Sequence, residues 1–121
     1  NPASDVSGQG GYSSNERREI INAANSSNPV TAETASAPRE NFPDDGKAEV
    51  GVTLPSGEKT NIELYHGHAY MVVDADQNGV TLANPHGHNN DQTGREVDGT
   101  FTMSWEDYEK YYGSTTIGSV K

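Results

Sequence analysis

From residue 48 onward, apolar and polar residues alternate with a period of two, the pattern of half-buried β-strands. Turns rich in Gly, Asn, Asp and Ser separate the alternating runs, as they do between antiparallel strands. The pattern predicts strands over 48–54, 61–65, 68–73, 80–84 and 100–103, a short strand over 30–34, an edge strand over 115–120, and a polar loop over 86–99.

Two short stretches instead have apolar residues at helical spacing. The first, over 17–25, follows a capping box formed by Ser13 and Glu16. The second, over 105–112, follows Ser104 as its N-cap and carries aromatic residues on one side. One helix before the strands and a short one between late strands predict an α+β fold, an antiparallel β-sheet or partial barrel.

The composition fits one small, acidic domain. The chain has 121 residues, 31% of them hydrophobic, and a formal net charge of -10. We expect 1–12, rich in Gly and Ser, to be a flexible lead-in and 13–121 to be the folded unit. Because an acidic surface repels phosphate groups, we expect neither nucleic acid nor a membrane as a partner.

The absence of cysteine limits the chemistry of the chain. It excludes a disulfide, a thiolate zinc site and a cysteine nucleophile within this sequence. Because the chain begins at Asn1 and not at Met, we expect a processed product or an excised fragment.

All four histidines lie in two His-Gly-His triplets, 66–68 and 86–88. Side chains alternate between the two faces of a strand, so His68 and Asn84 share one face of a hairpin if residue 68 pairs with residue 84. That register requires a loop with an odd number of residues, or a bulge. We expect Gly79, in a left-handed conformation, to provide that bulge. Asn84 Oδ1 would then lie within hydrogen-bond reach of a His68 ring nitrogen. A carboxamide in that position orients an imidazole for general-base work on a nucleophile.

Three blocks of the sequence resemble the second catalytic subdomain of calpain-like cysteine peptidases, which have a papain fold. Residues 67–70 read Gly-His-Ala-Tyr, as in that family, and residues 84–87 read Asn-Pro-His-Gly where the family has Asn-Pro-Trp-Gly. Residues 98–108 are similar to its downstream Asp-Gly-Glu-Phe-Trp-Met-Ser block. The resemblance implies that His68 is the catalytic base and Asn84 its orienting residue.

The sequence departs from the family in ways that matter. His86 replaces the Trp that shields the His–Asn pair from water, and Thr100 replaces a Glu of the family's calcium site. The family's nucleophile and oxyanion-stabilising Gln belong to an upstream subdomain that is missing here. The resemblance therefore implies an enzyme half, incomplete alone, that acts on protein or peptide substrates with a Cys from a missing segment or a partner chain. If such a partner binds this chain, we expect an exposed apolar patch near His68.

Two other functions stay open. One is a non-catalytic binding or effector-associated module of the same fold. The other is a histidine metal site, because imidazoles at i and i+2 on adjacent strands could give zinc three or four nitrogen ligands.

Residues 74–79 match the first half of an EF-hand calcium loop, but Pro85 stands at its twelfth position. We expect a hairpin turn there, with weak calcium binding as the alternative, and no resident cofactor.

Overall fold

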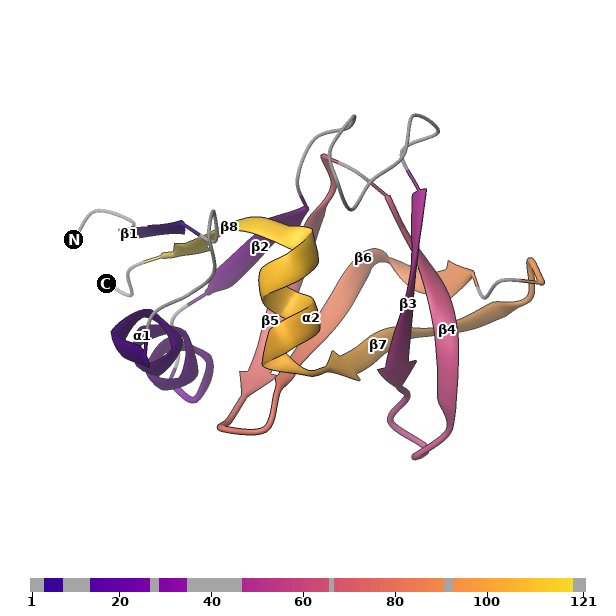
Figure 1. Cartoon of the computed structure of the whole chain (residues 1–121), viewed down its shortest axis with the longest axis horizontal. Coiled ribbons are helices and arrows are strands. Elements are labelled where there is room, and N and C mark those ends of the chain that lie inside the picture. Colours follow the sequence, from indigo (N-terminus) through magenta and orange to yellow (C-terminus); the bar gives the residue numbers. More distant parts are fainter. Residues whose placement is uncertain are drawn as a thin grey trace.

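One antiparallel sheet, with a helix between its first two strands and a helix between its last two strands in chain order, makes up the fold (Figure 1). The computed structural model describes residues 4–7, 14–26, 29–34, 47–65, 67–90 and 93–118. The elements are β1 (Ser4–Ser7), α1 (Ser14–Ala24), β2 (Val30–Thr34), β3 (Lys47–Thr53), β4 (Lys59–Tyr65), β5 (Ala69–Ala75), β6 (Val80–Asn90), β7 (Glu96–Met103), α2 (Trp105–Tyr111) and β8 (Tyr112–Ile117).

The eight strands found in the described residues follow the order β1-β8-β2-β5-β6-β7-β3-β4. All neighbouring pairs are antiparallel, and the sheet is open, with β1 and β4 at its two ends. The predicted α+β class, with an N-terminal helix and a short late helix, is confirmed. Neither helix has the length and apolar character needed to cross a membrane, as far as the described residues go.

An aromatic cluster fills the core between the sheet and α2. The ring of Tyr70, on β5, meets Phe101 edge-on at a centroid distance of 5.9 Å and Tyr112 at 5.6 Å. Tyr108, on α2, stacks on Tyr112 at 4.8 Å and meets Trp105 edge-on at 5.5 Å. Edge-on and stacked rings add to the apolar burial that stabilises a small domain. Burial also raises the pKa of Tyr70 to about 12.

Polar contacts cap α2 and link it to α1. Ser104 is the predicted N-cap of α2, since its side chain accepts a hydrogen bond from the Asp107 backbone N–H at 3.2 Å. Arg17, on α1, forms an ion pair with Glu109 on α2 and lies over the Trp105 ring at 5.6 Å. These contacts hold the two helices together.

Two expectations about the strands change. The predicted loop over 86–99 is wrong, because β6 continues to Asn90 and pairs with β7 from Glu96 onward. The predicted edge strand is also wrong in its position, because β8 lies between β1 and β2. It becomes internal because Ser4–Ser7, within the expected lead-in, adds to it as β1. A strand added at a sheet edge pairs through backbone N–H and C=O groups, and the apolar pattern of the sequence does not reveal such pairing.

Candidate functional site

A β-bulge in β5 turns His68 and Asn84 to the same face of the sheet. At the turn of the hairpin, Ala75 pairs with Val80; beyond the bulge between Val72 and Asp74, Val72 pairs with Leu82. Without that extra residue, the register at the turn would place Asn84 opposite Met71 on the other face. The requirement for a bulge is therefore met.

The bulge is not where the sequence analysis placed it. Gly79 does not have a positive φ, and the extra residue lies at Val73. Gly79 is needed for a different reason, since a Cβ there would lie 2.3 Å from the Met103 carbonyl oxygen. The predicted pairing of 68 with 84 is also wrong, because continuing the observed register places Asn84 opposite Tyr70. His68 is then a diagonal neighbour of Asn84, still within reach of a long side chain.

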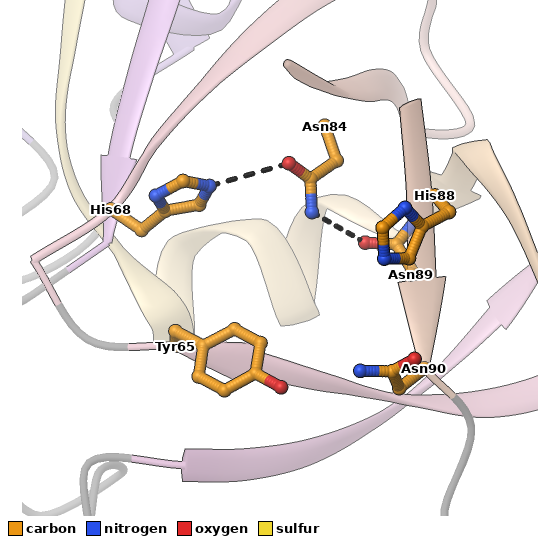
Figure 2. A pocket seen from close by; sticks show the side chains of 6 residues that line it. All are labelled: Tyr65, His68, Asn84, His88, Asn89 and Asn90. Carbon is orange, nitrogen blue, oxygen red and sulfur yellow. Dashed lines mark hydrogen bonds between the residues drawn. The ribbon is translucent and has the colours of Figure 1, made fainter. Parts of the chain in front are cut away.

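The predicted contact between the two side chains is confirmed. His68 Nε2 lies 3.3 Å from Asn84 Oδ1 (Figure 2). Asn84 is buried, with 8% of its surface exposed, whereas His68 is half-buried and packs edge-on against Tyr70 at a centroid distance of 4.8 Å. The imidazole is thus held by an amide at one nitrogen and by an aromatic ring.

A second irregularity shapes the site on the β6 side. Between the pairs Ala83–Thr100 and His88–Asp98, β6 advances five residues while β7 advances two. The extra residues fall in the Asn-Pro-His-Gly segment, over 84–87, and only Gly99 lies opposite them. A Cβ on Gly99 would lie 2.6 Å from the Gly87 carbonyl carbon, so this wide bulge requires glycine there.

The wide bulge brings a residue into the site that sequence reasoning missed. Asn89 follows Asn84 by five positions, and the bulge turns both side chains inward. Asn84 Nδ2 donates to Asn89 Oδ1 at 3.0 Å, and Asn89 Nδ2 donates to the Asp98 carbonyl oxygen at 3.0 Å. Asn89 is only 3% exposed, so this chain of amides forms the buried wall behind His68.

Thr34, also missed, fixes the backbone of His68. Its hydroxyl accepts from the His68 N–H at 2.9 Å and donates to the Tyr65 carbonyl oxygen at 2.6 Å. Its own N–H donates to the His68 carbonyl oxygen at 3.0 Å. A buried threonine at the end of β2 thus ties the start of β5 to the end of β4.

His68, Asn84 and Asn89 border a pocket of about 480 Å³ that is open to solvent (Figure 2). It is lined by Tyr65, His68, Asn84, His88, Asn89 and Asn90. Among the lining residues that the structure describes there is no Asp, Glu, Lys or Arg, and Tyr65 is the one phenol. These described side chains offer hydrogen-bond donors and acceptors around the imidazoles of His68 and His88.

The apolar patch expected near His68 is not found among the described residues. The large exposed hydrophobic side chains there are Met71, 52% exposed, and Val73, 46% exposed. On β5 they alternate with Tyr70 and Val72, so they face away from the core and the pocket.

The structure bears on the metal alternatives only in part. In the described part of the chain, no group of three or more His, Asp or Glu side chains is placed to hold a metal ion. His66 and the side chain of His86 lie outside that part, and so does any contact of the His86 side chain with the His68–Asn84 pair. The EF-hand-like segment forms the expected hairpin turn, in which Asp76 Oδ1 accepts from the N–H groups of Asn78 and Gly79 at 2.8 and 3.1 Å.

The chain has no match among protein-family models and no significant match among curated protein sequences.

Proposed function

We propose that this chain supplies the histidine and asparagine of a calpain-like thiol peptidase, and that the cysteine comes from a segment or chain outside this sequence. The observation that carries the proposal is the 3.3 Å contact between His68 Nε2 and Asn84 Oδ1 beside an open pocket. The resemblance of residues 67–70 and 84–87 to the family's two motifs supports the same assignment.

In this role His68 moves protons and Asn84 holds it in place. Nδ1 of His68 takes the proton of the cysteine thiol, and the thiolate attacks the peptide carbonyl carbon. The C–N bond then breaks, the imidazolium gives its proton to the leaving amine, and water hydrolyses the thioester. The nucleophile would approach the side of the ring that faces away from Asn84 (Figure 2).

The proposal is tested by measuring casein cleavage by the parent protein that contains this chain. We expect His68→Ala to lower kcat/KM by about 10²–10⁴-fold, the usual contribution of a general base. Alkylation with iodoacetamide should abolish cleavage, since the nucleophile is a thiol. Met71→Ala, on the outward face of the same strand, is the matched control and should cleave like the wild type.

Cleavage that persists in His68→Ala, or that survives alkylation, would contradict the proposal. A parent protein with an intact cysteine that cleaves neither casein nor unstructured peptides would contradict it too.

That last outcome would favour the second candidate, a non-catalytic binding module of the same fold. Its support is the polar lining of the pocket together with the absence of an apolar patch beside His68 in the described residues. Such a module would bind peptides through hydrogen bonds, and truncation of Asn90 at the pocket wall would weaken peptide binding measured by calorimetry.

A further inference from the structure

Asn89 is a polar residue buried directly behind the His68–Asn84 pair. Its amide bridges Asn84 Nδ2 and the Asp98 carbonyl oxygen, with both contacts at 3.0 Å. We infer that Asn89 is a positioning residue that determines which ring nitrogen of His68 carries the proton. The use of that proton rests on the proposed function, but the state of the ring can be measured without it.

The direction of every hydrogen bond in this row follows from one backbone atom. A carbonyl oxygen only accepts, so Asn89 must present Nδ2 to Asp98, and its Oδ1 then faces Asn84. Asn84 must in turn present Nδ2 to Asn89 and Oδ1 to His68. Since that oxygen also only accepts, Nε2 of His68 donates. The neutral imidazole therefore carries its proton at Nε2 and its lone pair at Nδ1.

This tautomer is the one that a base acting through Nδ1 needs. If the Asn84 amide rotated by half a turn, its Nδ2 would donate to Nε2 and hold the proton at Nδ1. The two amide orientations have nearly the same shape, so packing alone cannot select between them. The acceptor that Asn89 places behind Asn84 does select, because a reversed Asn84 would set two carbonyl oxygens against each other.

The test uses this chain itself, labelled with ¹⁵N, and measures the tautomer of His68 from its ring nitrogen shifts at about pH 9, where imidazoles are neutral. We expect the proton at Nε2 in the wild type. Asn89→Leu removes the acceptor and should lower the ratio of Nε2–H to Nδ1–H by about fivefold, the effect of one net hydrogen bond. Asn89→Asp keeps an acceptor for Asn84, although its second oxygen faces the Asp98 carbonyl oxygen; it should keep the proton at Nε2 and lower the stability of the chain. Asn78→Leu, in the exposed turn, is the matched control.

An unchanged ratio in a folded Asn89→Leu chain would overturn the inference, since a purely structural residue would leave the tautomer unaffected. If the leucine variant does not fold, the tautomer of His68 and the nuclear Overhauser effects of the Asn84 amide protons are measured in the wild type. Nε2–H, with the Asn84 amide protons close to Asn89 by nuclear Overhauser effects, supports the inference. Nδ1–H, or Asn84 amide protons close to the His68 ring, overturns it.

These readouts separate the inference from the proposed function. A chain with the expected tautomer whose parent never cleaves peptides would refute the peptidase and leave the role of Asn89 standing. Casein cleavage that requires His68 but is unaffected by a tautomer shift in Asn89→Leu would keep the peptidase and remove Asn89 from its mechanism.

Discussion

The β5–β6 hairpin is apolar toward its turn and polar toward its other end, on the same face of the sheet. Toward the turn, Val72 and Leu82 are buried in the core. Toward the other end, His68 and Asn84 take the corresponding places and border a pocket. Tyr70 marks the boundary, because its ring contacts Phe101 on one side and His68 on the other.

At the apolar end of the hairpin the side chains stabilise the fold. At the polar end the fold positions the side chains of the pocket. The core end is filled by close-packed aromatic rings, whose burial stabilises the fold. The pocket end contains amides whose hydrogen bonds contribute little net stability but restrict orientation. Substitutions at the two ends should therefore change different quantities.

The largest loss of stability is expected for Phe101→Ala, at the core end. Phe101 is fully buried, so its truncation leaves a cavity and should lower the free energy of unfolding by about 3–5 kcal/mol in urea denaturation. Met71→Ala removes an apolar side chain of similar size that is 52% exposed, and should cost about 0.5 kcal/mol or less. Equal losses in the two variants would refute the division between core and surface.

High pH should weaken the core end selectively. Burial raises the pKa of Tyr70 to about 12, while in the unfolded chain it titrates near 10. Below about pH 10 both states keep the proton, so the stabilisation is complete; above it only the unfolded state ionises. The free energy of unfolding should then fall as pH rises from about 10 to 12, by up to about 3 kcal/mol for this residue.

Tyr112, whose pKa burial also raises, adds to the same trend. Denaturation at a series of alkaline pH values measures the slope, and Tyr70→Phe should make it shallower. An unchanged slope in that variant would show that Tyr70 ionises equally in both states.

A smaller effect on stability than that of Phe101→Ala, but the most informative about the pocket, is expected for Gly99→Ala. The added Cβ would meet backbone atoms of Gly87 and His88 at 2.6–2.8 Å, so the wide bulge must shift, at a cost of about 1–3 kcal/mol. Gly51→Ala is the matched control, because its Cβ would meet only the Asn61 side-chain oxygen, at 3.3 Å.

The side-chain amide resonances of Asn84 and Asn89 should move in Gly99→Ala and stay in place in Gly51→Ala. If they stay in place in both, the bulge does not position the two amides.

The sequence predicted the parts of this molecule that depend on local pattern. Alternation identified the β3–β4 and β5–β6 hairpins, and the N-cap at Ser104 identified the start of α2. The contact between His68 and Asn84 was also predicted, because strand parity and the need for a bulge constrain it.

The parts that the sequence did not predict depend on contacts between distant residues. Val73 has no property that marks it as a bulge, and residues 84–87 look like a loop although they interrupt a strand that continues. Asn89 and Thr34 gain their roles only when β6 meets β7 and β2 meets β5. Short polar side chains have many alternative partners, so their pairing follows from the tertiary fold.

The carbonyl oxygen of Asp98, which begins the row of hydrogen bonds to His68, belongs to the main chain. Every amino acid provides that atom, so a mutational scan could replace the side chain at position 98 and still leave the polarity of the row intact. Conversely, a change elsewhere that tilts this peptide plane would disturb His68 without altering any residue of the pocket. The orientation of the imidazole therefore depends partly on backbone geometry, which a comparison of side chains would not reveal.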